Sequence, residues 1–89
     1  MKLVIDVGNT HIVLGVYRSG TLQFVSRLRS DSEKTADEYA TLIRSVLALY
    51  PTAGEMTGAI ISSVVPALQK TLKQAITRLF PVRVLTVGP

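Results

Sequence analysis

The residues best suited to chemistry lie near the N-terminus, in the run Asp6-Val7-Gly8-Asn9-Thr10. This run follows the apolar residues Leu3-Val4-Ile5, so a carboxylate, an amide and a hydroxyl stand on a tight turn at a strand end. Gly8 has no Cβ, and successive N–H groups in such a turn can form an anion-binding nest. The Asp6 carboxylate would repel a phosphate unless a magnesium ion lay between them. These residue types therefore suit a nucleotide phosphate with its magnesium ion.

Two well-known phosphate motifs are excluded by the residues around this turn. No Gly-Lys-Ser or Gly-Lys-Thr sequence follows Gly8, so the turn is not a Walker loop. The next segment has the pattern of a strand, whereas a dinucleotide fingerprint opens a helix. Asp-x-Gly-Asn is also ordinary hairpin chemistry that needs no ligand. On spacing alone, a purely structural turn is the competing interpretation.

The composition indicates one small globular α/β domain. The chain has 89 residues, of which 47% are hydrophobic, and this share argues against disorder. Cysteine is absent, which excludes a disulfide scaffold and a thiolate metal site and fits a reducing cytosol. No run approaches the roughly 20 apolar residues of a membrane helix, and Asp6 interrupts the first apolar run too early for a signal peptide. We expect a cytoplasmic protein with no membrane partner.

The net charge of +4 raises the question of nucleic-acid binding. The ten Lys and Arg residues are dispersed along the chain, and no group of them alternates with aromatic residues. We therefore expect no nucleic-acid partner. Arg29 and Lys34 flank a polar loop and could steer an anion, although solvated surface charge is the simpler interpretation.

Three strands joined by short turns are predicted at the N-terminus: Lys2–Val7, Ile12–Tyr17 and Thr21–Arg29. The first is apolar on both faces and so should be central in its sheet. In the third, alternation predicts one buried face, carrying Leu22, Phe24, Ser26 and Leu28, and one solvated face, carrying Gln23, Val25, Arg27 and Arg29. The short connections predict an antiparallel meander.

The rest of the chain predicts a helix, a strand, a helix and a strand. Thr35 opens the first helix, because Glu38 three residues later completes a capping box, and Pro51 ends it. Gly58–Val64 is a buried strand, Pro66 begins the second helix, and Val82–Val87 follows as the last strand. Helical crossovers favour parallel pairing. The predicted fold class is α/β, in the order β-β-β-α-β-α-β, with a mixed five-stranded sheet and two helices.

Four separated motifs resemble those of type III pantothenate kinases, the group once called Bvg accessory factor proteins. They are Ile5-Asp6-Val7-Gly8-Asn9-Thr10, Thr35-Ala36-Asp37-Glu38-Tyr39, Ile61-Ser62-Ser63-Val64-Val65-Pro66 and Val87-Gly88-Pro89. That family belongs with sugar kinases, heat-shock ATPases and actin, whose two ribonuclease-H-like halves close on ATP. The resemblance implies that residues 1–89 form the N-terminal, ribonuclease-H-like half-domain of an actin-like ATPase.

The resemblance also implies a ligand set. ATP would be bound by the residues from Asp6 to Val13, with Asp6 near the metal and Asn9 and Thr10 at the phosphates. The full set is Asp6, Val7, Gly8, Asn9, Thr10, His11, Ile12 and Val13. The implied reaction is phosphorylation of pantothenate to 4'-phosphopantothenate in coenzyme A biosynthesis. The implied enzyme is a cytoplasmic homodimer that needs Mg²⁺ and a monovalent cation, K⁺ or NH₄⁺.

The chain also departs from that family, because its members are roughly three times as long. Their Gly-x-Asp-Arg segment, with the catalytic aspartate and the pantothenate contacts, lies downstream, as do the cation site and the second half of the ATP site. None of these occurs in the 89 residues. We therefore expect no catalytic residue here and no kinase activity from this fragment alone. The alternative is a stand-alone ribonuclease-H-like module for binding or regulation.

Several other polar residues admit two interpretations. His11 could touch a phosphate, as the resemblance implies, or point outward from a strand without a partner. Ser62 and Ser63 end a predicted strand, where a role in a cleft and a cap of the strand end are both open. Asp37 and Glu38 fall in the first turn of a helix, where acids complement the helix dipole, so we interpret them as structural.

Overall fold

The computed structural model describes residues 1–52 and 54–88, and its elements follow the predicted order. The strands and helices are β1 (Lys2–Val7), β2 (His11–Arg18), β3 (Thr21–Arg29), α1 (Ala36–Leu49), β4 (Gly58–Ser63), α2 (Pro66–Leu79) and β5 (Val84–Val87). The predicted fold class is therefore confirmed. Boundaries differ from the expected ones by one or two residues, most visibly at β5, which begins at Val84 rather than Val82.

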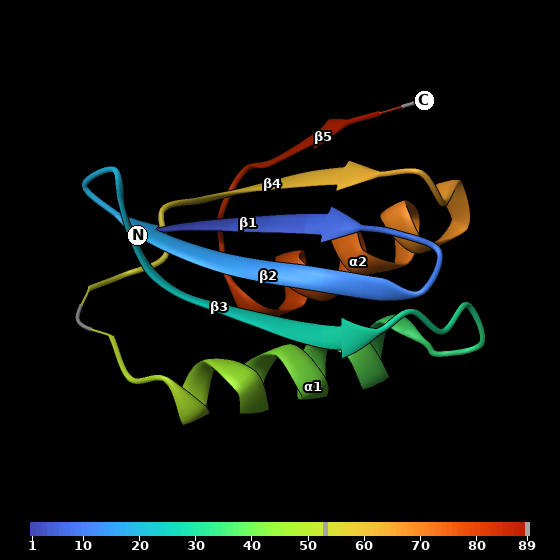
Figure 1. Cartoon of the computed structure of the whole chain (residues 1–89), viewed down its shortest axis with the longest axis horizontal. Helices are drawn as coiled ribbons and strands as arrows, with labels where there is room; N and C mark the ends of the chain where they lie inside the picture. Colours follow the sequence, from blue (N-terminus) through green and yellow to red (C-terminus); the bar gives the residue numbers. More distant parts are fainter. Residues whose placement is uncertain (53, 89) are drawn as a thin grey trace.

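The strands form one mixed sheet in the order β3-β2-β1-β4-β5 (Figure 1). β1 pairs antiparallel with β2, and β2 with β3, whereas β4 is parallel to both β1 and β5. Helical crossovers lead to β4 and β5, which accounts for the parallel half. β1 lies at the centre with a partner strand on each side, as its apolar run Leu3-Val4-Ile5 predicted.

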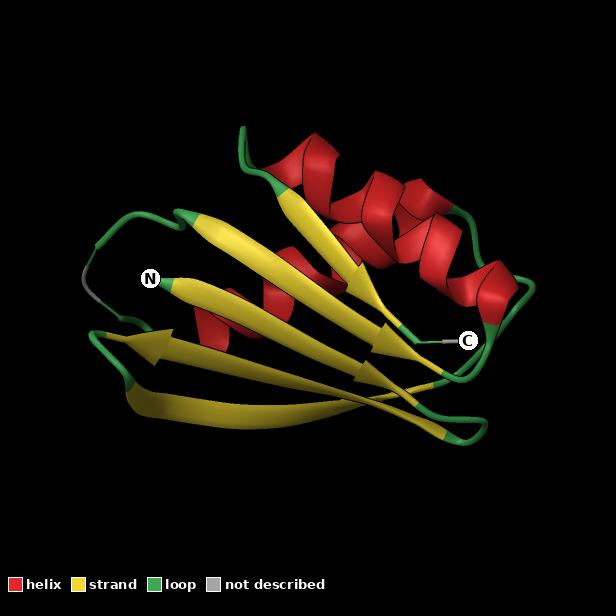
Figure 2. Ribbon diagram, turned by 90° about the horizontal axis from the view of Figure 1, so that it is seen from above, coloured by secondary structure: helices red, strands yellow, loops and turns green. Residues whose placement is uncertain are grey.

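Both helices cover the same face of the sheet (Figure 2). The core side chains of β1 and β2 recur at every second position, and all join one cluster with residues of both helices: Leu3, Ile5, Val7, Ile12, Leu14 and Val16. The fully buried helical members of that cluster are Tyr39, Ile43, Leu72, Ala75 and Ile76. The opposite face of the sheet, here called the open face, carries neither helix.

A β-bulge in β3 corrects one sequence-based prediction. Val16 pairs with Phe24 but Tyr17 pairs with Leu22, so Gln23 is an extra residue on β3. Leu22 therefore turns to the open face with Tyr17, where it is 44% exposed, and the prediction that it shares the buried face of Phe24 is wrong. Phe24 keeps the helical side and stacks on Tyr50 at the end of α1, with ring centroids 4.6 Å apart.

The helix boundaries follow the predicted local chemistry. Thr35 is the N-cap of α1, and the capping box with Glu38 is present. Pro66 is the first residue of α2, where a missing N–H leaves no helical bond unmade. Neither helix in residues 1–52 and 54–88 has the length and apolar character needed to cross a membrane.

Candidate nucleotide-phosphate site

The turn predicted to bind phosphate lies at one end of the sheet, where three parallel strands finish. Val7 at the end of β1 pairs with Ser63 at the end of β4, and Ser62 pairs with Val87 of β5. The N–H of Val64 continues the ladder by donating to the carbonyl of Val7 at 3.1 Å. Three of the four sequence motifs therefore meet at one edge, the edge at which open α/β sheets bind ligands (Figure 1).

The phosphate turn is held in shape by hydrogen bonds from two directions. The N–H of Gly8 donates to the carbonyl of His11 at 2.9 Å, which closes the hairpin between β1 and β2. Ser30, directly after β3, donates from Oγ to the carbonyl of Gly8 at 2.7 Å and from its N–H to the carbonyl of Thr10 at 2.9 Å. Sequence reasoning missed Ser30, because only the pairing of β2 with β3 brings it to the turn.

Asn9 and Thr10 are the residues of this turn that remain available to a ligand. Both are exposed, and within the described part of the chain neither their N–H groups nor their side chains donate a hydrogen bond. Val7 and Ile12 point into the core at 1% and 0% exposure, so any contact from them to a ligand would come from the backbone. His11 is exposed, and Val13 is half-buried on the open face.

Asp6 lies on the open face, one residue before the core position Val7. Its register partners on the two neighbouring strands are Val13 of β2 and Ser62 of β4. No group of three or more His, Cys, Asp or Glu that could hold a metal occurs within residues 1–52 and 54–88. A single exposed carboxylate still fits Mg²⁺, which commonly takes one or two carboxylates and completes its shell with water and substrate phosphates.

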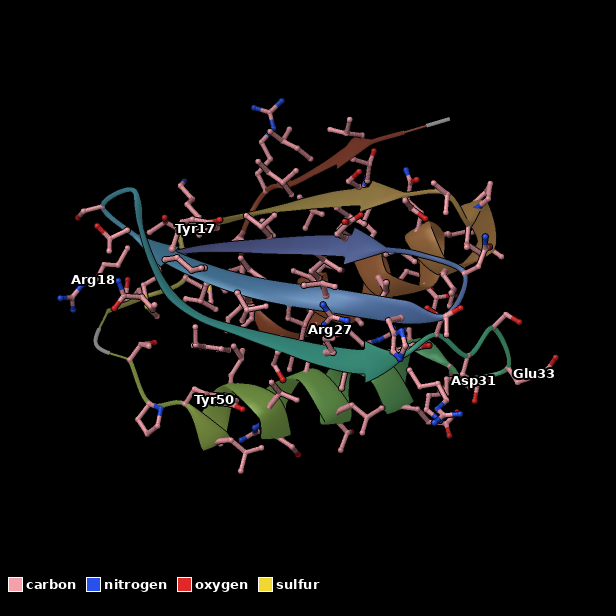
Figure 3. The ribbon with its side chains drawn as sticks, in the orientation of Figure 1. Tyr17, Arg18, Arg27, Asp31, Glu33 and Tyr50 are labelled. Atoms are coloured by element: carbon pink, nitrogen blue, oxygen red, sulfur yellow. The ribbon has the colours of Figure 1, made fainter. Side chains whose placement is uncertain are left out.

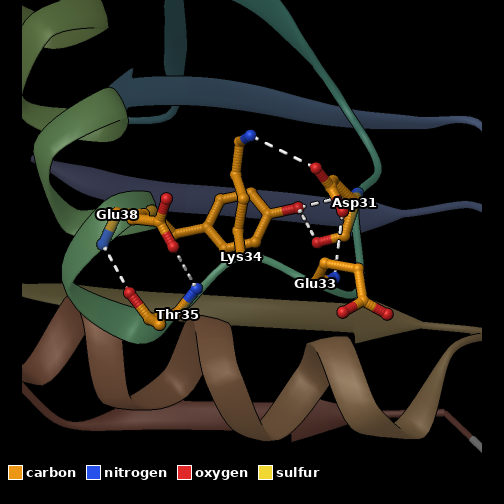
Figure 4. Close-up of polar contacts among 6 residues, drawn as sticks. Asp31, Glu33, Lys34, Thr35 and Glu38 are labelled. Atoms are coloured by element: carbon orange, nitrogen blue, oxygen red, sulfur yellow. Dashed lines mark hydrogen bonds and ion pairs between the residues drawn. The ribbon is translucent and has the colours of Figure 1, made fainter.

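The second motif, Thr35–Tyr39, fixes the loop that holds the phosphate turn. The Tyr39 hydroxyl, which is fully buried, donates to the carbonyl of Asp31 at 2.8 Å and accepts from its N–H at 2.9 Å (Figure 4). Asp31 directly follows Ser30, so the anchored tyrosine fixes the residue that holds Gly8 and Thr10. The N–H of Glu33 donates to the Asp31 carboxylate, and this bond, reinforced by Lys34, lowers the pKa of Asp31 below 3.8.

The capping box gives Glu38 a structural role. The N–H of Thr35 donates to the Glu38 carboxylate at 2.9 Å, and the N–H of Glu38 donates back to the Thr35 hydroxyl at 3.2 Å (Figure 4). The bond from the Thr35 N–H lowers the pKa of Glu38 below 4.5. Asp37 pairs with Arg78 of α2 at 3.2 Å. Glu38 therefore caps α1 and Asp37 joins α1 to α2, so both acids have the structural role that the sequence predicts.

The third and fourth motifs pack against each other. Ser63 is 2% exposed. Its hydroxyl donates to the carbonyl of Val65 at 2.8 Å and accepts from the N–H of Val65 at 2.9 Å, so Ser63 caps the strand end. Gly88 has a φ of +136°, and a Cβ there would collide with the backbone of Ser63. Pro89 lies outside the described residues. The close approach of β5 to β4 explains why the last motif needs its glycine.

The two cations near the loop have different surroundings. Lys34 pairs with Asp31 at 3.3 Å and so stabilises the loop after β3. Arg29 is exposed at the end of β3, opposite His11 in the register. Neither placement tests a role in steering an anion.

Comparison with known proteins decides the family. The family model for type III pantothenate kinase matches residues 2–89. This chain belongs to the type III pantothenate kinase family. Over its whole length it is 45% identical to the type III pantothenate kinase of Halalkalibacterium halodurans, 46% to that of an Exiguobacterium species and 43% to that of Moorella thermoacetica. It spans 35% of the length of each of these relatives.

Solved structures support the fold of this pantothenate kinase family member independently. A Bacteroides thetaiotaomicron protein of actin-like ATPase fold and unknown function matches 94% of the chain, and 32% of its own length, with a TM-score of 0.62 at 10% identity. Thermus thermophilus RuvC matches 99% of the chain and 61% of its own length, with a TM-score of 0.56 at 21% identity. At these identities the likeness concerns the fold alone, and it confirms the predicted ribonuclease-H-like class.

Proposed function

We propose that this chain is the ATP-phosphate-binding part of a kinase that converts pantothenate to 4'-phosphopantothenate in coenzyme A biosynthesis. The observation that carries the proposal is the turn after β1, whose exposed donors at Asn9 and Thr10 stand beside the exposed carboxylate of Asp6. Two of the other three motifs end at the same edge of the sheet as that turn, and the relatives named above are type III pantothenate kinases.

Each residue of the site has a distinct task in this proposal. Asn9 and Thr10 donate hydrogen bonds to phosphate oxygens, from N–H groups that Ser30 keeps in a fixed turn. Asp6 holds Mg²⁺, which would neutralise charge on the phosphates. A preorganised turn avoids the entropy of ordering a loop around the nucleotide, which strengthens binding.

The proposal assigns this chain one half of a larger site. Phosphoryl transfer depends on positioning and on charge stabilisation around the transferred group, and one wall of a cleft does not supply both. We propose that residues 1–89 form the N-terminal half-domain of a cytoplasmic homodimer. Pantothenate and a monovalent cation, K⁺ or NH₄⁺, are then bound by residues outside this chain.

The test is Asp6→Asn in the full-length protein, assayed for pantothenate phosphorylation with Mg²⁺ and ATP. We expect kcat to fall by about 100- to 1,000-fold, as for other removed groups that stabilise developing charge. Thermal stability should change little, because Asp6 is exposed and its side chain makes no hydrogen bond or ion pair among the described residues.

Asp37→Asn is the matched control, since it removes the same charge from the surface of α1 and should leave kcat unchanged. A lower melting temperature for Asp6→Asn with unchanged activity would contradict the proposal. That result would instead favour a stand-alone module in which the turn is purely structural.

A further inference from the structure

Arg27 lies on the open face in line with Asp6. It pairs with Val13 on β2, and Val13 pairs with Asp6 on β1, so the three residues form one row across the sheet. With neighbouring strands 4.7–4.9 Å apart, the Cα atoms of Arg27 and Asp6 are about 10 Å apart. In Figure 3 the Arg27 side chain is drawn over β2, on the side of β3 that faces β1, and the residue is exposed.

Among the residues that the structure describes, none forms an ion pair with Arg27. Residues 1–52 and 54–88 form two ion pairs, Lys34–Asp31 and Arg78–Asp37, and Arg27 takes part in neither. Its neighbour in the row, Val13, is apolar and offers no acceptor. Arg27 thus brings a planar fork of N–H donors to the same row as the Asp6 carboxylate, two strands away.

The neighbouring row adds positive charge at the same end of the open face. Arg29 pairs with His11, and both are exposed one step closer to the phosphate turn. The open face therefore carries Asp6 on β1 and basic side chains on β2 and β3, with the turn donors of Asn9 and Thr10 between them in the chain. Such an arrangement suits an anion that also carries a metal ion.

We propose that Arg27 binds the terminal phosphate of a nucleoside triphosphate on the side opposite the magnesium ion at Asp6. The inference rests on the proposed function of the turn. Arginine matches phosphate with two parallel N–H···O bonds, which a lysine cannot provide. During transfer, charge spreads over the three equatorial oxygens of the phosphoryl group, and a metal ion on one side leaves the other side to a cation such as Arg27.

Nucleotide binding by the full-length protein tests this assignment. Calorimetry with Mg²⁺ would compare a non-hydrolysable ATP analogue, ADP and AMP on wild type, Arg27→Ala and Arg27→Lys. We expect Arg27→Ala to bind the ATP analogue about 10- to 100-fold more weakly, the loss typical of hydrogen bonds to a charged group. AMP binding should be unchanged, and Arg27→Lys should recover part of the loss.

Arg44→Ala is the matched control, because Arg44 is exposed on α1, on the helical side of the sheet. Its removal should leave the affinity for each of the three nucleotides unchanged. The inference is overturned if Arg27→Ala binds the ATP analogue as tightly as wild type. It is also overturned if the affinity for AMP falls by the same factor as the affinity for the ATP analogue. An unchanged melting temperature of Arg27→Ala would establish that any loss is local.

An assay of pantothenate phosphorylation by the wild type distinguishes failure of the Arg27 assignment from failure of the proposed kinase function. If the wild type phosphorylates pantothenate and Arg27→Ala retains its affinity for the ATP analogue, the assignment of Arg27 fails while the proposed function stands. If triphosphate binding depends on Arg27 but pantothenate is not a substrate, the proposed function fails and the assignment of Arg27 stands. A wild type that binds no triphosphate overturns both.

Discussion

At the scale of single residues, the candidate site combines side chains that follow one another in the chain with others that strand pairing brings to them. Asp6, Asn9 and Thr10 are recognisable because carboxylate, amide and hydroxyl follow one another at a strand end, and all three are exposed in the structure. Ser30 and Arg27 are ordinary polar residues of β3 and its end. Their relation to the turn depends on the register of β2 against β3, which includes a bulge that alternation does not predict.

The substitution Gly88→Ala tests the close packing of Gly88 against the backbone of Ser63. Ala at this position should destabilise the chain by about 2–4 kcal/mol, because it adds strain at a positive φ to overpacking against Ser63. Gly20→Ala is the control: Gly20 has a φ of +78° with nothing within 4 Å of an added Cβ, so about 1 kcal/mol is expected. Urea unfolding followed by circular dichroism measures both, since the chain has no tryptophan. Equal costs for the two variants would contradict the close approach of β5 to β4.

At the scale of elements, local patterns were sufficient for order and type. Hydrophobic periodicity, the Thr35–Glu38 capping box and Pro66 at a helix start predicted the strands and helices within one or two residues. The bulge at Gln23 escaped prediction because Leu22 continues the alternation of β3 without interruption. Only cross-strand pairing shows that Leu22 lies beside Tyr17, where both side chains cover Gly15.

The capping box of α1 predicts a specific dependence of stability on pH. Its hydrogen bonds hold the pKa of Glu38 below 4.5 in the folded chain, so the stabilisation is present above that value and is lost as pH falls through the lower folded pKa. Glu38→Gln keeps an acceptor for the Thr35 N–H but cannot titrate. We expect the melting temperature of wild type to fall more steeply than that of Glu38→Gln as pH drops below about 4.5. Parallel curves for the two proteins would show that Glu38 is not the titrating group.

At the scale of the whole molecule, the two faces of the sheet differ. The helices cover one face, where the core lies, whereas the open face combines the phosphate turn, Asp6 and Arg27 with apolar side chains that remain partly exposed. Those side chains include Leu22, Val25, Ile60, Leu85 and Val87, between 40% and 57% exposed. Periodicity predicted that β3 has a solvated face, but it could not show that the apolar residues of β4 and β5 share it, because their order in the sheet is a tertiary property.

This one-sided architecture leads to a prediction for the 89-residue chain by itself. It should fold, as judged by circular dichroism, yet transfer no phosphate from ATP to pantothenate, while the full-length protein turns over in the same assay. The physical reason is that a phosphoryl group in transfer must be stabilised on every side. The described residues offer the Asp6 carboxylate, the phosphate turn and the arginines Arg27 and Arg29, all on a single open surface. Formation of 4'-phosphopantothenate by the isolated chain, above the rate without protein, would show that this surface holds a complete active site.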